Sequence, residues 1–199
     1  YDAQEELFLQ RHRVVGRRAR SKEMTGRVLG KKTTLLKEFY ESLPFDLTGA
    51  QKRSVKEIVG DLRVARPMNR LLQGDVGSGK TFVAMCDMLL AVDSGAQAAL
   101  MAPTQILAEQ HYLTFAKWLE PLGLRIGLAT ADRREEISDA QIVLGTHALL
   151  YEKVEFGDVA LVAIDEKQQI AVQQRGKLNQ RGLMPVAPGW TATRSRGKV

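Results

Sequence analysis

The chain of 199 residues has a single cysteine, Cys86, and no long apolar run. One cysteine excludes an internal disulfide, which suits a reducing compartment. Its apolar neighbours in residues 83–89 predict a buried small hydrophobic residue rather than a reactive thiol. No apolar run approaches the roughly 20 residues of a membrane-spanning helix, so no membrane partner is expected. Residues 1–20 lack a secretory apolar region and do not begin with Met, so we interpret the chain as a piece of a longer protein or a processed one.

Acidic residues are missing from residues 167–199, which carry seven lysines and arginines. Residues 1–40 carry ten lysines and arginines against five acids, whereas residues 41–166 carry twelve against eighteen. The net charge of +6 therefore arises at the two ends of the chain. This distribution favours a polyanion as partner. It fits equally well a solvated helix face followed by a loose tail.

Hydrophobic periodicity predicts alternating strands and helices in the middle of the chain. The predicted helices are a basic amphipathic one at 2–20, a short one at 34–43 that Pro44 ends, one at 48–62 that Thr48 caps, and two at 80–92 and 104–119. The predicted strands are 70–73, 98–102, 124–129, 141–144 and 159–164. This alternation predicts an α/β fold whose mostly parallel sheet is covered on both faces. The last thirty or so residues lose periodicity, and we predict no element there.

Residues 74–81 read GDVGSGKT and fulfil the pattern G-x-x-x-x-G-K-T between a predicted strand and a predicted helix. Glycines let several backbone N–H groups point into one hollow, and the helix start adds its positive end. Lys80 would neutralise the β- and γ-phosphates of ATP, and the hydroxyl of Thr81 would bind Mg²⁺. The predicted nucleotide-binding residues of this loop are Gly74, Gly77, Ser78, Gly79, Lys80 and Thr81.

Two acids follow the apolar strand in LVAIDE, residues 161–166. Ligands of parallel sheets bind where the strands end. Asp165 would hold Mg²⁺ through its water shell, and Glu166 would polarise the water that attacks the γ-phosphate. Lys80, Asp165 and Glu166 are therefore the predicted catalytic residues. Two acids after a strand are by themselves also common on protein surfaces, so the prediction depends on the glycine loop.

Together these motifs resemble a superfamily 2 helicase motor, and within that group the bacterial RecG branch of ATP-dependent DNA helicases. The resemblance lies in LPFDLTGAQKR (43–53), PMNRLLQGDVGSGKT (67–81), ALMAPTQILAEQHY (99–112), GTHALL (145–150) and LVAIDE (161–166). It implies a RecA-like P-loop NTPase lobe that uses ATP and Mg²⁺. It also implies a branched or forked DNA substrate and a bacterial, cytoplasmic and nucleoid-associated setting. The transcription-repair coupling translocases usually have Asp at the position of Asn69, which favours the RecG branch.

The resemblance assigns further residues by position. Gln51 matches the residue that reads the adenine edge, although a polar residue near a helix start would look the same. Pro103, Thr104 and Gln105 match a motif that contacts the DNA backbone, and a Thr hydroxyl with exposed N–H groups at a helix start suits a phosphate. Gly145, Thr146 and His147 match a second DNA contact. Thr191 and Thr193 match the motif that couples hydrolysis to DNA.

The chain also departs from the family. The residues after the two acids read DEKQQIAVQQR (165–175) instead of DEQHRFGVEQR, so Gln168 replaces a histidine that relays between nucleotide and coupling motif. Residues 185–190 (PVAPGW) replace an apolar strand, and RSRGKV follows TAT in place of PIPRTL. These departures keep a second reading open, a module that binds nucleotide or DNA without turnover. A small-molecule kinase would share the glycine loop but leave APTQILAEQ and GTHALL unexplained.

The resemblance also sets the expected organisation. Residues 1–43 are predicted to be a basic helical appendage and residues 44–199 the ATP-binding lobe. Motors of this class clamp ATP between two RecA-like lobes, and the second lobe supplies an arginine finger worth about 10³–10⁵ in rate. The second lobe and the wedge domain of the parent protein are thus expected partners. We expect this chain alone to bind nucleotide weakly, to hydrolyse it slowly and not to unwind DNA.

Overall fold

The computed structural model describes residues 27–65, 69–72, 79–130, 137, 139–146, 149, 156–165 and 190–194, with 69–72 and 190–194 described by their backbone alone. The helices are α2 (Thr34–Ser42), α3 (Gly49–Leu62), α4 (Lys80–Asp93), α5 (Gln105–Leu119) and the 3₁₀ helix η1 (Glu120–Leu122). The strands are β1 (Asn69–Leu72), β2 (Gln97–Met101), β3 (Ile126–Ala129), β4 (Ile142–Gly145), β5 (Val159–Ile164) and β6 (Trp190–Arg194). The predicted helix at 2–20 lies outside the described residues.

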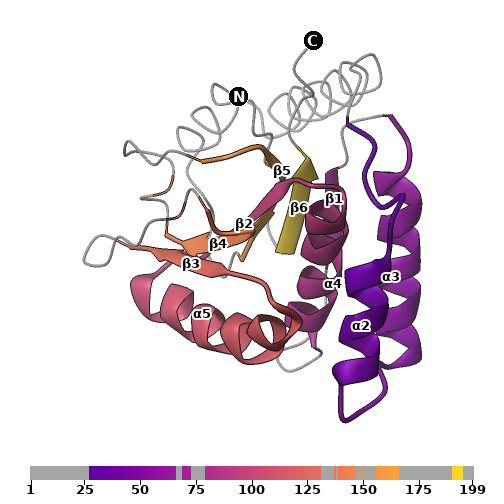
Figure 1. Ribbon diagram of the computed structural model, residues 1–199, viewed down its shortest axis with the longest axis horizontal. Coiled ribbons are helices and arrows are strands. Elements are labelled where there is room, and N and C mark those ends of the chain that lie inside the picture. The colour runs from indigo at the N-terminus through magenta and orange to yellow at the C-terminus, as the bar shows by residue number, and fades with distance from the viewer. Residues whose placement is uncertain are drawn as a thin grey trace, which may run out of the picture.

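The six strands form one sheet in the order β1-β6-β5-β2-β4-β3 (Figure 1). Strands β5, β2, β4 and β3 are mutually parallel neighbours. Strand β6 runs antiparallel to both of its neighbours, β1 and β5, so β1 points the same way as the parallel strands. The prediction of a mostly parallel α/β sheet is therefore confirmed, and β6 is an element that the sequence did not predict.

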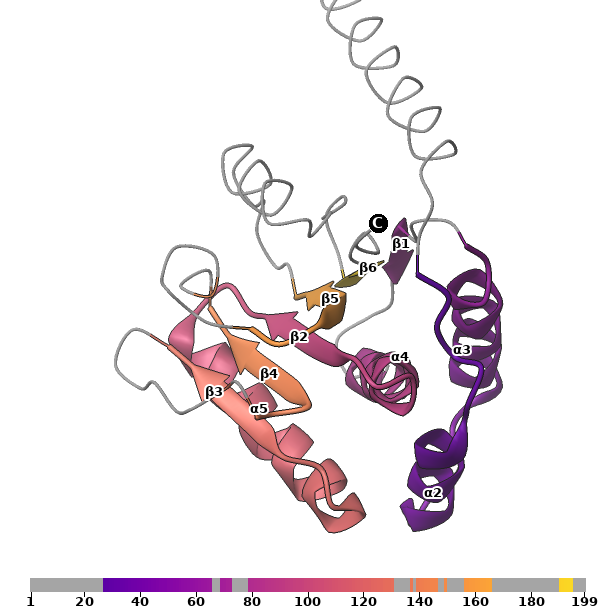
Figure 2. The same ribbon diagram turned by 45° about the horizontal axis from the view of Figure 1, so that its top comes forward.

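All the described long helices lie on one side of the sheet (Figures 1 and 2). Helix α4 packs on β2 and β5, and α5 packs on β3 and β4. Helices α2 and α3 form an outer layer on α4. The contacts bury alternate strand residues such as Ala98, Leu100 and Leu144, together with an almost wholly apolar α4. One continuous core therefore joins the sheet to all four helices.

In strands β2 to β5, the second face of the sheet is buried as well. Strand β5 (VALVAI) is buried at every position, as is β2. Met101, Val162 and Ile164 pack around Phe156 on this face, and Val143 lies in the adjoining cluster. Strands buried on both faces read as continuous apolar runs, which is why the sequence indicated them so directly.

Local sequence sets the helix starts. Thr48 and Gln51 form a capping box at α3, in which each side chain accepts a bond from the other residue's backbone N–H. Thr104 caps α5 by accepting from the N–H of Leu107 at 3.3 Å. The predicted strand at 124–129 begins later, at Ile126. The N–H of Arg125 donates to the Gln141 side chain at 2.7 Å, and its carbonyl oxygen accepts from the N–H of Gln141 at 3.0 Å.

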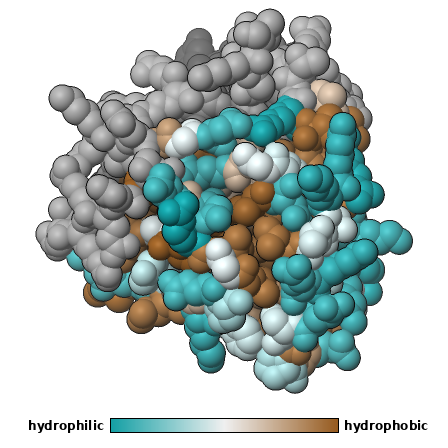
Figure 3. All heavy atoms as spheres, in the orientation of Figure 1, coloured by the Kyte–Doolittle hydropathy of each residue, from teal (hydrophilic) through white to brown (hydrophobic). Residues whose placement is uncertain are grey.

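An aromatic cluster joins the segment before α3 to the two inner helices. Phe45, Phe82 and Trp118 meet edge to face, with ring centroids 5.2 to 5.9 Å apart. Phe45 remains 44% exposed. Figure 3 shows apolar residues reaching the surface in the middle of the face that it draws. Such aromatic pairs contribute about 0.5–1.5 kcal/mol beyond their buried area. The cluster therefore fixes the start of α3 relative to the start of α4.

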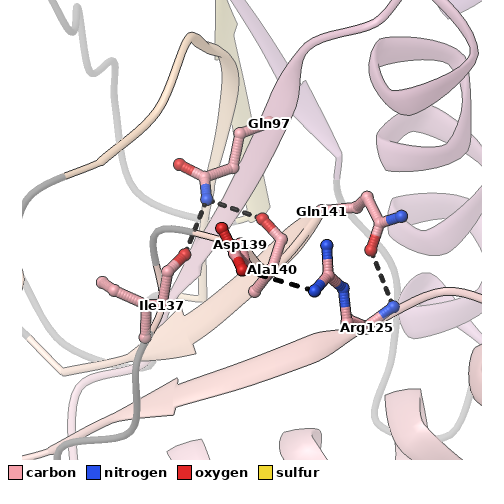
Figure 4. Close-up of polar contacts among 6 residues, drawn as sticks. All are labelled: Gln97, Arg125, Ile137, Asp139, Ala140 and Gln141. Atoms are coloured by element: carbon pink, nitrogen blue, oxygen red, sulfur yellow. Dashed lines mark hydrogen bonds and ion pairs between the residues drawn. The ribbon is translucent and has the colours of Figure 1, made fainter.

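The edge of the sheet where the strands begin is closed by a buried side chain, Gln97 (Figure 4). Its amide nitrogen donates to the carbonyl oxygens of Ile137 and Ala140, at 3.0 and 2.6 Å, and its amide oxygen accepts from the N–H of Gly157 at 3.1 Å. One amide thus satisfies three backbone groups of two connecting segments.

Two further facts concern cysteine and membranes. Cys86 is fully buried in α4, as predicted, and burial raises the pKa of its thiol. Among the described helices, none is both long and apolar enough to cross a bilayer.

Candidate functional site

The site lies at the edge of the sheet where the strands end. Leu71 of β1 and Ile164 of β5 both pair with Thr191 of β6, so they end level with each other. Met101 of β2 pairs with Ile164 and with Gly145 of β4. The segments that follow these strands therefore emerge together, at the edge where ligands of open α/β sheets bind. Neighbouring strands lie about 4.8 Å apart, so β1 and β5 are separated by about 10 Å.

Helix α4 begins at this edge with Gly79, Lys80 and Thr81. Gly79 is the N-cap residue and has φ +75°, a left-handed conformation that favours glycine. Its carbonyl oxygen accepts from the N–H groups of Phe82 at 3.0 Å and Val83 at 3.4 Å, which are the first hydrogen bonds of the helix. The first turn of α4 has no acidic residue. A helix start of this kind attracts anions such as phosphates.

The side chain of Gln51 lies directly against Gly79. A Cβ atom added to Gly79 would come within 2.0 Å of the Gln51 amide nitrogen. The predicted adenine-reading residue is thus brought to the predicted phosphate loop across 28 positions of sequence. Its amide oxygen already accepts from the N–H of Thr48 at 2.8 Å. Gln51 therefore caps helix α3, which is the structural alternative left open by the sequence, and it also lies at the candidate site. Adenine recognition by Gln51 stays a prediction.

Asp165 follows β5 at the same edge and is held from two sides. Its N–H donates to the carbonyl oxygen of Met101 at 2.8 Å, and its carboxylate lies 2.7 Å from Nε2 of His111. Both side chains are 13% exposed. His111 belongs to α5, and no role is predicted for it from its sequence. Within its own helix it reads as one more half-buried polar residue, and only the fold reveals its partner 54 positions away.

Mg²⁺ would be held here by few protein ligands. In the described part of the chain, no group of three or more His, Cys, Asp or Glu gathers as a metal cluster. Mg²⁺ in nucleotide sites is usually bound by one or two protein groups together with phosphates and water. A single carboxylate, Asp165, and the hydroxyl of Thr81 in the first turn of α4 fit that pattern of ligands.

The first predicted DNA contact lies at the start of α5. Pro103 and Thr104 are exposed, and Gln105 is half-buried. Thr104 uses its hydroxyl oxygen as the helix cap, and Gln105 donates to Glu109 at 3.1 Å. The first turn of α5 has no acidic residue. This end of α5 is therefore accessible to an anion.

The second predicted DNA contact is less accessible. Gly145 and Thr146 are both buried. A Cβ atom on Gly145 would lie 2.3 Å from the carbonyl oxygen of Ala129, so packing alone requires glycine there. The N–H of Thr146 donates to the same oxygen at 3.4 Å. A DNA contact at these residues stays a prediction.

The remaining predicted site residues can be placed only in part. Thr191 and Thr193 lie in β6, where their backbones pair with β1 and β5. The others, Gly74, Gly77, Ser78, His147 and Glu166, lie outside the described residues.

The chain is similar to known proteins in both sequence and structure. The profile of the DEAD/DEAH box helicase family matches residues 48–193. The ATP-dependent DNA helicase RecG of Synechocystis is 50% identical over 169 residues, 80% of this chain and 20% of that protein. RecG of Escherichia coli K12 is 42% identical over 188 residues, 89% of this chain and 27% of that protein.

A solved structure of RecG bound to a three-way DNA junction matches 84% of this chain and 24% of its own, with 38% identity and a TM-score of 0.76. The chain thus spans 20–27% of the curated relatives named above. With a family match over most of its length, this chain belongs to the DEAD/DEAH box helicase family and is similar to the RecG helicases within it.

Proposed function

We propose that this chain is the ATP-binding lobe of an ATP-dependent DNA helicase or translocase. One observation carries the proposal: Gln51 lies against Gly79 at the start of α4, on the sheet edge from which Asp165 also emerges. Binding of a nucleoside triphosphate with Mg²⁺ requires a helix start that attracts phosphates, an amide that contacts the base and a carboxylate that holds Mg²⁺.

The chemistry of the lobe is divided among these groups. Lys80 and the N–H groups at the start of α4 bind and orient the phosphates. Thr81 and Asp165 hold Mg²⁺, which when bound neutralises charge that develops on the phosphates. Glu166 orients the attacking water and accepts its proton. The second lobe of the parent protein supplies the remaining groups, so this chain is incomplete for unwinding.

The DNA substrate is proposed from the relatives and the charge distribution. One matching structure contains a three-way DNA junction, and the relatives are bacterial DNA helicases. Thr104 offers an exposed helix start, and both ends of the chain are basic. We place the activity on branched or forked DNA during repair and recombination, next to the bacterial chromosome, with the wedge domain as the neighbouring part.

Nucleotide binding can be tested with one matched pair of lysines. Lys80→Ala should weaken Mg²⁺–ATP binding about 10- to 100-fold, because a charge-assisted contact to phosphate contributes about 1.5–3 kcal/mol. Lys56→Ala removes an exposed lysine of α3 and should leave the affinity unchanged. Titration of a fluorescent ATP analogue measures both. Equal affinities for the two variants would contradict the proposal.

The second candidate, a module without turnover, is favoured by the changed residues 167–169. Glu166→Gln separates the two functions in the parent protein. A motor that hydrolyses ATP loses turnover in this variant and keeps nucleotide binding. A binding module shows no turnover to lose in the unaltered protein.

A further inference from the structure

The contact between His111 and Asp165 joins helix α5 to the nucleotide site. Nε2 of His111 and Oδ2 of Asp165 are 2.7 Å apart, and only 13% of each side chain is exposed. A carboxylate can only accept a hydrogen bond, so Nε2 donates. A short bond to an ionised group in a half-buried place is among the stronger hydrogen bonds in proteins. It fixes the direction of one carboxylate oxygen.

The main chain alone does not fix this carboxylate. The N–H of Asp165 is bonded to Met101 of β2, which places the residue at the sheet edge. The side chain beyond Cα can still rotate, and the described partner that limits its rotation is His111. The orientation of the proposed Mg²⁺ ligand therefore depends on the position of α5.

The same helix carries the proposed DNA contact. Thr104 caps α5 and is exposed, and His111 lies seven residues further along, about 10 Å along the helix axis. The buried residues Ala108, Phe115 and Leu119 hold α5 against the sheet as one body. A displacement of its first turn would therefore reach the imidazole, because a hydrogen-bonded helix moves as a unit.

We propose that His111 is a positioning residue, whose hydrogen bond ties the orientation of the Asp165 carboxylate to the position of α5. Through this bond, contact of a nucleic-acid phosphate at Thr104 is coupled to binding of Mg²⁺–nucleotide beside Asp165. This inference rests on the proposed function. The coupling is reciprocal, so nucleotide must change the affinity for nucleic acid by the same factor as nucleic acid changes the affinity for nucleotide.

The test compares two amides of different length at position 111. In His111→Gln the amide nitrogen lies about as far from the backbone as Nε2 and can donate to Asp165. In His111→Asn the same group is one methylene shorter and falls short of the carboxylate. Gln110→Asn makes the same shortening at the neighbouring, exposed position of α5 and serves as control. His and Asn have similar helix propensities, so α5 itself is little affected.

The measurement is the affinity for a fluorescent ATP analogue with Mg²⁺, with and without a saturating single-stranded oligonucleotide, and again in EDTA. We expect the oligonucleotide to tighten binding about 5-fold or more in the unaltered chain, the lower end of typical coupling. His111→Asn should bring the ratio of the affinities with and without the oligonucleotide close to one. Its nucleotide affinity in EDTA should equal that of the unaltered chain. His111→Gln and Gln110→Asn should keep the ratio.

A ratio in His111→Asn equal to that of the unaltered chain would overturn the inference, and so would an equal loss in Gln110→Asn. An unaltered chain that binds nucleotide with a ratio of one would also overturn it, while the proposed function stands. An unaltered chain that binds no nucleotide would instead refute the proposed function. Circular dichroism of each variant confirms that the loss is not unfolding.

Discussion

Gly79 illustrates how one position serves both the backbone and the site. Its φ of +75° disfavours any side chain, and the space beside it is taken by the Gln51 amide. Gly95 has almost the same backbone, φ +73°, but nothing lies within 4 Å of an added Cβ. The two glycines therefore separate the cost of the backbone conformation from the cost of displacing Gln51.

We predict that Gly95→Ala lowers the free energy of unfolding by about 1 kcal/mol, the usual cost of a left-handed residue. Gly79→Ala should cost about 1 kcal/mol more, because Gln51 must leave its capping position. In a Gln51→Ala background the two substitutions should cost the same. Urea unfolding measures all of these values. Equal costs in the unaltered chain would show that Gln51 does not occupy this place.

At the scale of single residues, the sequence pointed to those members of the candidate site that belong to local motifs. Gly79, Lys80, Thr81 and Asp165 are recognisable because their chemistry requires fixed spacing beside a strand or helix end. His111 could not be found in this way, because its role depends on a partner that the fold brings from β5 to α5. The packing role of Gly145 was hidden for the same reason.

At the scale of elements, two glutamines at the start of the sheet differ in which amide atom makes the hydrogen bonds drawn in Figure 4. Gln97 donates through its amide nitrogen to two buried carbonyl oxygens. Gln141 instead accepts through its amide oxygen from the N–H of Arg125. A glutamate has the same shape as glutamine but cannot donate when ionised.

Gln97→Glu should therefore lower the free energy of unfolding by about 3 kcal/mol or more, since it removes the side-chain donor of the Ala140 carbonyl oxygen, removes one of two donors to the Ile137 carbonyl oxygen and buries a charge. Gln141→Glu should change it by less than about 0.5 kcal/mol, because its acceptor oxygen remains. Thermal unfolding followed by circular dichroism distinguishes the two. A similar loss in both variants would contradict the assigned roles.

The helices and central strands were predictable because their periodicity and caps are local. The bounds of the strands were predicted less well, as at Arg125, whose N–H donates to a side chain although its carbonyl oxygen accepts from the N–H of Gln141. Strand β6 begins at the last residue of PVAPGW (185–190), a segment with two prolines and a glycine that gives no strand signal. It pairs with β1 and β5, and these partners from other parts of the chain could not be recognised from its own composition.

At the scale of the whole molecule, α2 shares the core of the sheet. Phe39 of α2 is fully buried and stacks on Phe82 of α4 with centroids 6.4 Å apart. Leu29 and Leu36 belong to the same buried cluster. The division of the chain at residue 43 stays a prediction, and Phe39 offers a way to test it.

We predict that Phe39→Ala costs about 3–5 kcal/mol, as for other large-to-small changes in a core. Because α2 would unfold with the lobe, the urea midpoints of unfolding followed by circular dichroism and by tryptophan fluorescence should both shift to lower urea concentration. Leu113→Ala, at a position that is 67% exposed, should have little effect. A fluorescence midpoint unchanged in Phe39→Ala would mean that α2 is an independent appendage.

The antiparallel strand β6 has a consequence for the order of events during translation. Among the described strands, β1 hydrogen-bonds with β6 alone, and about 120 residues separate the two. The block β2 to β5 is assembled from nearer neighbours. While the ribosome is still making residues 73–189, β1 cannot pair with β6, because β6 has not yet been synthesised. Nascent chains should therefore gain the β2–β5 block first and protect residues 69–72 from protease only after residue 194 has left the exit tunnel.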